Sequence, residues 1–94
     1  MSKVVTDNRE QSRYEITVDG TLAGFAEYAL RANGGIVVFV HTEIFPEYEG
    51  QGVGSALARG ALDDVRGGGR TVVPLCPFIK GWIEKHPDYQ DLVH

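Results

Sequence analysis

Three alternating glycines, Gly50, Gly52 and Gly54, stand between a predicted strand and a predicted helix. Glycine lets the backbone turn tightly and lets a bulky anion come close to the main chain. The N–H groups from Gln51 to Ser55 would lack partners at the start of the helix, and they would face the positive end of its dipole. The pattern indicates a pyrophosphate site, although such a turn can also be purely structural.

Two other phosphate-binding motifs do not fit this turn. A P-loop needs a lysine and then a serine or threonine after its last glycine, whereas Gly54 is followed by Ser55 and Ala56. A dinucleotide-binding fingerprint needs a different glycine spacing and a βαβ unit with an acidic residue on the next strand. The turn is therefore assigned to neither class.

The segment before the turn is predicted to form an antiparallel three-stranded meander. Alternating apolar residues predict a strand over Tyr14–Val18, and Asp19-Gly20 is a strong signal for a hairpin. A second strand is expected over Thr21–Arg31, followed by a turn at Asn33-Gly34-Gly35. The third strand, Ile36–Ile44, begins with a continuous apolar run, which is typical of a central strand covered on both faces.

The segment after the turn is predicted to form a helix, a strand and a second helix. Apolar residues recur every four positions and predict a helix over Val53–Arg66, ended by the glycines at 67–69. A fourth strand is expected over Arg70–Cys76 and a short helix over Phe78–Lys85. The fold class is α+β, with the fourth strand parallel to the third.

Length and composition limit the function. The 94 residues fit one domain, assigned to 13–94, after a flexible tail at 1–12. A net charge of −4 argues against a general nucleic-acid binder. The single cysteine, Cys76, excludes an internal disulfide, and the longest apolar run, Ile36–Val40, is too short for a membrane span. A cytoplasmic protein without a metal site, monomeric or weakly dimeric, is expected.

The stretch from Glu49 to Leu57 resembles the coenzyme A pyrophosphate motif of the GNAT N-acetyltransferase superfamily. That motif is Arg/Gln-x-x-Gly-x-Gly/Ala at the start of a helix that follows the central strand. Gly52 and Gly54 match it, whereas Glu49 stands where the superfamily usually has arginine or glutamine. The motif thus matches at its glycines and departs at its first position.

Wider segments resemble the short YjdJ-type single-domain subgroup of that superfamily. They are His41–Ile44, Pro74–Phe78 and His86–Tyr89. The resemblance implies a minimal GNAT-like fold without the two helices that larger members place between their first two strands. It also implies an acetyl-CoA cofactor, with the pantetheine arm between the third and fourth strands. The acceptor would be an amine of a small molecule or a protein.

The resemblance places the cofactor on the glycine turn and on the strands and helix beside it. The expected cofactor-binding residues are Glu43, Ile44, Gly50, Gln51, Gly52, Val53, Gly54, Ser55, Phe78 and Lys80. A coenzyme A-binding module without catalysis is the alternative function, and a small interaction protein with a purely structural glycine turn is a third.

Three side chains are candidates for the chemistry of acetyl transfer, which needs a polarised carbonyl and a base for the amine. Cys76 ends the fourth strand and is a candidate acetyl-handling thiol, or else a small buried apolar residue. His41 and Glu43 are candidate bases, or else a structural histidine and a solvated carboxylate. Tyr89 is expected to pack on the core rather than to act as the acid.

Overall fold

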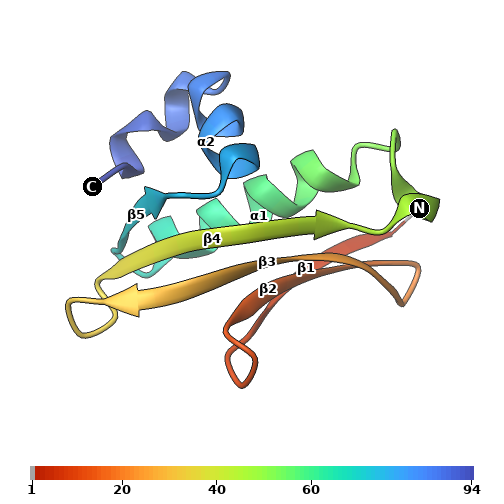
Figure 1. The fold of residues 1–94 in the computed structure, drawn as a ribbon, viewed down its shortest axis with the longest axis horizontal. Coiled ribbons are helices and arrows are strands. Elements are labelled where there is room, and N and C mark those ends of the chain that lie inside the picture. The colour runs from red at the N-terminus through yellow and green to blue at the C-terminus, as the bar shows by residue number, and fades with distance from the viewer. Residues whose placement is uncertain (1) are drawn as a thin grey trace.

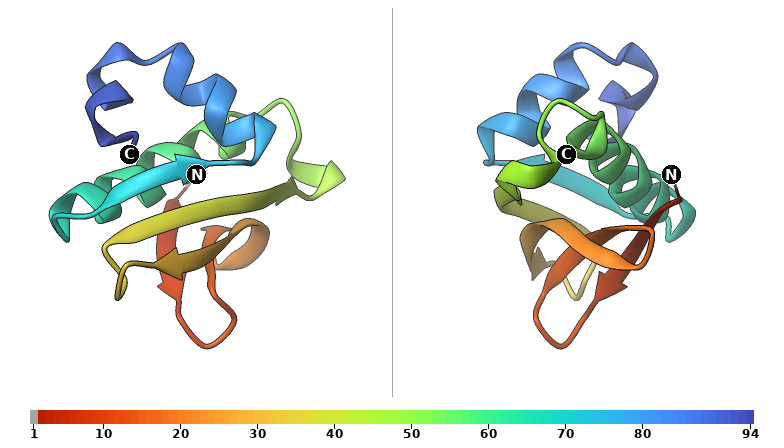
Figure 2. Two further views of the ribbon diagram at one scale, coloured as in Figure 1. Left: turned by 60° about the vertical axis from the view of Figure 1, so that its left-hand side comes forward. Right: turned by 90° about the vertical axis from the view of Figure 1, so that its right-hand side faces the viewer.

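The computed structural model describes residues 2–94 as one five-stranded sheet with helices α1 and α2 on the same face (Figures 1 and 2). The strand order is β1-β2-β3-β4-β5, antiparallel throughout except for the parallel pair β4–β5. The elements are β1 (Lys3–Asn8), β2 (Arg13–Val18), β3 (Thr21–Arg31), β4 (Ile36–Ile44), η1 (Pro46–Tyr48), α1 (Val53–Gly67), β5 (Thr71–Pro74), α2 (Pro77–Glu84) and η2 (Pro87–Leu92). The α+β class and the parallel β4–β5 pair are confirmed.

The N-terminal segment corrects the predicted fold. Residues 3–8 are not a flexible tail: they form β1, which pairs antiparallel with β2 and makes the meander four strands long instead of three. A Cβ atom at Gly60 of α1 would lie 2.7 Å from Cγ2 of Val5, so strand and helix are in close contact. Short-range periodicity does not reveal this strand, because its residues are exposed or half-buried and show no alternation of apolar and polar side chains, although its partner β2 follows directly after a turn.

Two tyrosine hydroxyls form hydrogen bonds between elements: one joins β3 to β1, and the other joins β2 to α1. Tyr28 donates a hydrogen bond of 2.6 Å to Asp7, and Tyr14 donates one of 2.7 Å to Asp64 of α1. Burial, the hydrogen bond to Asp7 and the charge of that carboxylate raise the pKa of Tyr28 to about 12. The pKa of Tyr14 is raised too, first by burial and then by its bond to Asp64. Both phenols therefore stay protonated over the physiological range.

Helix α1 forms because its apolar residues fall on one face. Val53, Leu57, Ala61 and Val65 are all buried against the sheet, as their four-residue spacing predicts. The helix ends at Gly67, one residue later than predicted, and the N–H of Gly68 bonds back to Asp64 O. This burial holds the N-terminus of α1 beside the end of β4.

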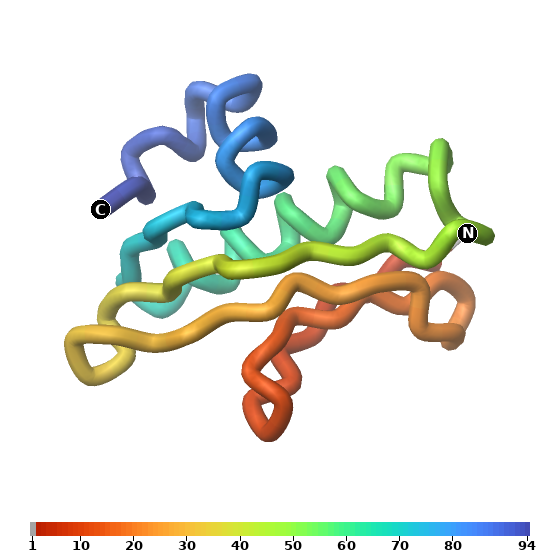
Figure 3. Tube along the Cα trace, in the orientation of Figure 1, coloured from red at the N-terminus to blue at the C-terminus, as the bar shows by residue number. Residues whose placement is uncertain are grey.

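Strands β4 and β5 pair over only four residues and then separate. Their register runs from Ile36 opposite Thr71 to Phe39 opposite Pro74. Glu27 pairs with His41 while Tyr28 pairs with Phe39, so Val40 is an unpaired bulge at this point. The predicted strand Arg70–Cys76 is thus shorter than expected, and the chain passes directly from β5 into α2 (Figure 3).

The C-terminal segment covers α1. Tyr89 in η2 is 5% exposed and donates a hydrogen bond to Asp63, which agrees with the prediction that it packs on the core. Arg66 of α1 forms a bidentate ion pair with Asp91, in which Nη1 and Nη2 each donate a hydrogen bond to one carboxylate oxygen. Among residues 2–94, no helix is long and apolar enough to cross a membrane.

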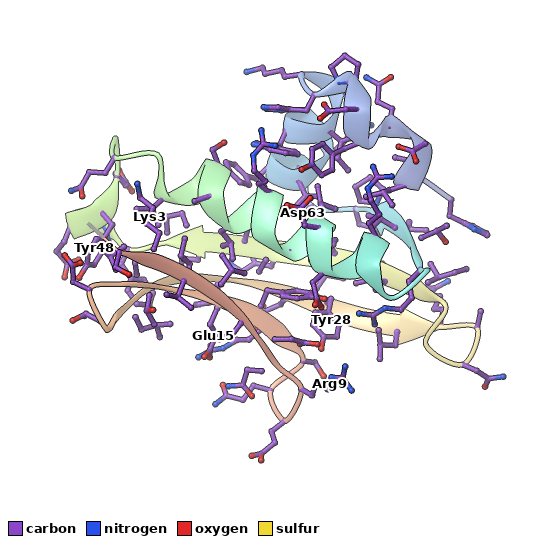
Figure 4. The ribbon with its side chains drawn as sticks, turned by 180° about the vertical axis from the view of Figure 1, so that it is seen from behind. Lys3, Arg9, Glu15, Tyr28, Tyr48 and Asp63 are labelled. Atoms are coloured by element: carbon purple, nitrogen blue, oxygen red, sulfur yellow. The ribbon has the colours of Figure 1, made fainter. Side chains whose placement is uncertain are left out.

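Replacing Tyr28 by phenylalanine is expected to lower the free energy of unfolding by about 1–3 kcal/mol, because the largely buried oxygen Oδ1 of Asp7 loses its donor, while Oδ2 keeps its contact with Arg9. Urea unfolding measures the loss. Tyr48→Phe, a hydroxyl deletion at the opposite end of the molecule (Figure 4), is the matched control and should change stability by less than about 0.5 kcal/mol. Equal losses in the two variants would contradict the assigned role of the Asp7 contact.

The same contact has a pH signature. Because the folded pKa of Tyr28 lies above the unfolded value of about 10, its contribution is complete below that pH and is lost as pH rises toward about 12. Stability of the wild type should therefore fall over this alkaline range more steeply than that of Tyr28→Phe. Parallel pH profiles would contradict the prediction.

Candidate functional site

A hollow of about 300 Å³ lies where the N-terminus of α1, the end of β4 and α2 meet. Its lining consists of Ile44, Tyr48, Glu49, Gly50, Gly52, Val53, Gly54, Ser55, Phe78 and Trp82. The structure thus brings together seven of the ten residues expected to bind a cofactor. Glu43, Gln51 and Lys80 are not part of the lining.

The glycine turn leaves the first amides of α1 available to a ligand. Gly50 and Gly52 both have φ of 76°, a conformation that side chains disfavour. Gly52 is the N-cap residue and has no side chain to cap the helix, and no acidic residue lies in the first turn. The N–H groups of Val53, Gly54 and Ser55 therefore lack intrahelical acceptors at the positive end of the helix dipole.

Gly54 keeps the hollow open. A Cβ atom at this position would lie 2.9 Å from Cζ of Phe78 and 3.5 Å from Cγ1 of Ile44. A side chain there would occupy the space between α1, α2 and β4. The third glycine is thus required by the close approach of neighbouring side chains rather than by its backbone conformation.

The separated part of β4 presents a free peptide edge. The N–H of Phe45 bonds to Ala23 O, so by the alternation of an antiparallel pair Phe45 and Glu43 turn their peptide groups toward β3. The peptide groups of Thr42 and Ile44 accordingly point away from β3, toward the side where β5 no longer pairs with β4. Of the two expected cofactor-binding residues on this stretch, Glu43 and Ile44, Ile44 has its backbone on this edge.

Cys76 lies where the two strands separate. It is 3% exposed, its N–H bonds to Phe39 O, and its thiol donates to Oγ1 of Thr42 at 3.2 Å. The thiol therefore bridges the gap between β4 and the start of α2. Cys76 is both buried, as expected of a structural cysteine, and adjacent to the free edge, as expected of an acetyl-handling thiol.

His41 and Glu43 lie on the other face of the sheet. Ile44 packs on the core and Thr42 contacts Cys76, so by the alternation of a strand Glu43 and His41 project away from α1. The side chains of His41 and Glu43 are 55% and 53% exposed, and Nε2 of His41 lies 3.6 Å from Oε1 of Glu43. The structure brings these two candidates together but separates them from Cys76.

A larger hollow, about 720 Å³, lies near the C-terminal end of α1, away from the glycine turn. It contains the carboxylates of Asp7, Asp63 and Asp64. Each already accepts a hydrogen bond from a tyrosine hydroxyl. Since these carboxylates serve to hold the fold together, the smaller hollow is the better candidate site.

Trp82 is a lining residue that is absent from the predicted site. A large aromatic side chain on a short helix is usually a core residue, and Trp82 is only 6% exposed. It nevertheless reaches the hollow, where its indole N–H donates to Oγ of Ser55 at 2.9 Å. The one available signal was that Phe78 and Trp82 are one helical turn apart, so both can face the same space.

Comparison with solved structures finds the same fold. An NMR structure of a GCN5-like candidate N-acetyltransferase from Staphylococcus aureus is 22% identical, with a TM-score of 0.71 over 97% of this chain and 87% of that one. A crystal structure of Ard1 from Thermoplasma volcanium is 23% identical, with a TM-score of 0.58, and the match covers 69% of this chain and 44% of that one. At these identities the likeness concerns the fold alone.

The sequence itself matches a family model. The model is described as GCN5-related N-acetyltransferase, and the match covers residues 13–92. It includes the strands β2 to β5, both α-helices and the whole lining of the candidate site. The chain therefore belongs to the GCN5-related N-acetyltransferase family.

Proposed function

We propose that this protein binds acetyl-CoA at the hollow before α1 and transfers the acetyl group to an amine. The main support for the proposal is that two sets of unpaired backbone groups line the same hollow. The uncapped amides of Val53–Ser55 lie at one side of the hollow, and the free edge of β4 at Ile44 lies at the other. Family membership supports the same cofactor.

The residues present fit the anionic part of that cofactor. Amides at a helix N-terminus are suited to pyrophosphate oxygens, and Gly54 leaves room for them that a Cβ atom would fill. Glu49 lines the same hollow and adds a negative charge. We infer that backbone donors, rather than an arginine in the turn, supply most of the attraction.

The free edge of β4 is suited to the pantetheine arm, whose amides can pair with peptide groups like an added strand. When bound, acetyl-CoA supplies an activated thioester carbonyl. Peptide N–H groups at the separation of β4 and β5 would donate to that carbonyl oxygen as charge develops on it. Cys76, held by Thr42 at 3.2 Å, is the proposed acetyl-handling thiol at this point.

His41 and Glu43 are the proposed bases for the amine. They lie together on the face of the sheet opposite α1, next to Phe25, whose ring centroid is 6.3 Å from that of His41. An imidazole and a carboxylate are both groups that can accept a proton from an amine. An acceptor would approach from this open face, while the cofactor occupies the other side of the separated strands.

A coenzyme A-binding module without catalysis is the second candidate. Two observations favour it: Glu49 opposes an anionic ligand, and His41 and Glu43 are separated from Cys76 by the sheet. Binding and turnover experiments distinguish the two functions.

Acetyl-CoA at about one hundred times its Kd is expected to stabilise the protein by about 2.7 kcal/mol and to raise Tm by about 11–20 °C. Gly54→Val should abolish this shift, because the side chain would fill the space between Phe78 and Ile44. Gly81→Val is the control, since a Cβ atom at Gly81 of α2 meets nothing within 4 Å. No shift with the wild type at millimolar acetyl-CoA would refute the cofactor assignment.

Cys76→Ala is expected to lower kcat by at least tenfold while leaving the Kd of acetyl-CoA unchanged, if the thiol takes part in transfer. Glu43→Gln should lower kcat by about 10²-fold if that carboxylate contributes to proton removal. Release of free coenzyme A thiol with a panel of amines measures turnover. A Cys76→Ala protein that loses stability but keeps its kcat would show that the thiol is structural.

A further inference from the structure

We infer that Trp82 is a positioning residue: it orients the hydroxyl of Ser55 so that its proton is directed to a phosphate oxygen of the ligand. This inference rests on the proposed function, since it concerns the same hollow. It goes further by assigning a side-chain donor to the anionic end of the ligand, and by assigning to α2 the task of holding that donor.

The first step concerns the direction of the hydrogen bond. The indole N–H of Trp82 lies 2.9 Å from Oγ of Ser55 and can only donate. Ser55 therefore acts as acceptor in this contact, and its own O–H proton must point elsewhere. In the middle of a helix a serine often donates to a carbonyl one turn earlier. Ser55 is instead the third residue of α1: Gln51, four positions before it, lies outside the helix, and the carbonyl of Gly52, three positions before it, already accepts from the N–H of Ala56.

The second step concerns location. Ser55 and Trp82 both line the hollow, together with Gly52 and Gly54. The free proton of Ser55 is thus available at the same place as the uncapped amides of the first turn of α1. A hydroxyl donor and backbone N–H groups converging on one space are suited to the several oxygens of a phosphate group.

The third step concerns rigidity. The indole of Trp82 stacks on His86 with a ring separation of 3.7 Å and an interplanar angle of 13°. Tyr89 packs edge-on against it at 5.0 Å, and the guanidinium of Arg59 lies 5.4 Å from the ring centroid. His86 is itself tied to Trp82 O through Nδ1 at 2.7 Å. Because the indole is confined on several sides, its N–H keeps one direction and selects one orientation of the Ser55 hydroxyl.

These contacts imply specificity for one part of the ligand. The Ser55 donor would act on phosphate oxygens and on nothing in the pantetheine arm or the acetyl group. Acetyl-CoA should depend on the Trp82–Ser55 pair, whereas S-acetylpantetheine, which carries the thioester but no pyrophosphate, should not. A role in packing alone would affect both ligands.

Isothermal titration calorimetry with these two ligands tests the inference. Ser55→Ala should weaken acetyl-CoA binding about tenfold, the loss of one hydrogen bond to a charged group. Trp82→Phe keeps the aromatic packing and removes the N–H, and it should weaken binding by about threefold to tenfold. The double variant should bind no more weakly than Ser55→Ala alone, since both changes remove the same donor.

Three controls make the result decisive. Tyr28→Phe removes a hydroxyl that contacts Asp7 and lies away from the hollow, so it should lower stability and leave the Kd of acetyl-CoA unchanged. Ser55→Thr restores a hydroxyl and should recover most of the affinity lost in Ser55→Ala. If Trp82→Phe does not fold, benzothienylalanine at position 82 keeps the shape of the indole and removes only its N–H.

Additive losses in the double variant, or equal weakening of acetyl-CoA and S-acetylpantetheine by Trp82→Phe, would overturn the positioning role while leaving the proposed function intact. Failure of the wild type to bind acetyl-CoA would instead overturn the proposed function together with this inference. Trp82 is the only tryptophan of the chain, so quenching or a shift of its fluorescence on ligand addition gives an independent readout in the wild type and in Ser55→Ala.

Discussion

The early separation of β4 from β5 is the constraint on which the candidate site depends. Parallel pairing ends at Phe39 and Pro74, because Val40 forms a bulge on one strand and a proline closes the other. Peptide groups of β4 beyond this point are left unpaired toward β5, and α2 begins almost immediately. The same separation places Cys76 opposite Thr42 and brings Trp82 over the N-terminus of α1. A fully paired β5 would have covered the edge and displaced α2.

The electrostatics of the site follow from its backbone. The chain carries a net charge of −4 and places Glu49 at the hollow, so an anionic ligand gains little from surrounding side-chain charge. Uncapped amides offset this, because they form fixed partial positive charges that need no counterion. The Trp82–Ser55 pair would add a neutral donor to them. In this arrangement the departure from the usual arginine or glutamine is compatible with phosphate binding.

The N-terminal strand and the C-terminal segment support this arrangement from outside. A domain of this size has a thin stability margin, so contacts that tie the termini to α1 matter. On one side Tyr28 bonds to Asp7 of β1, and on the other Arg66 contacts Asp91. The first contact holds β1, which packs against α1, in the sheet, and the second ties α1 directly to η2; the N-terminus of α1 is the part that faces the hollow.

Local sequence by itself determined most elements and the turn between them. The spacing from Val53 to Val65 specified the buried face of α1, and Gly50 and Gly52 marked the start of that helix, because helix periodicity and positive φ are short-range properties. Tertiary structure alone decided the features that depend on contacts between different elements of the fold. It made residues 3–8 a strand and placed His41 and Glu43 on the face away from Cys76, since the bulge at Val40 sets which side each residue faces. It also directed the indole of Trp82 to Ser55, a contact between residues 27 positions apart that no local pattern encodes.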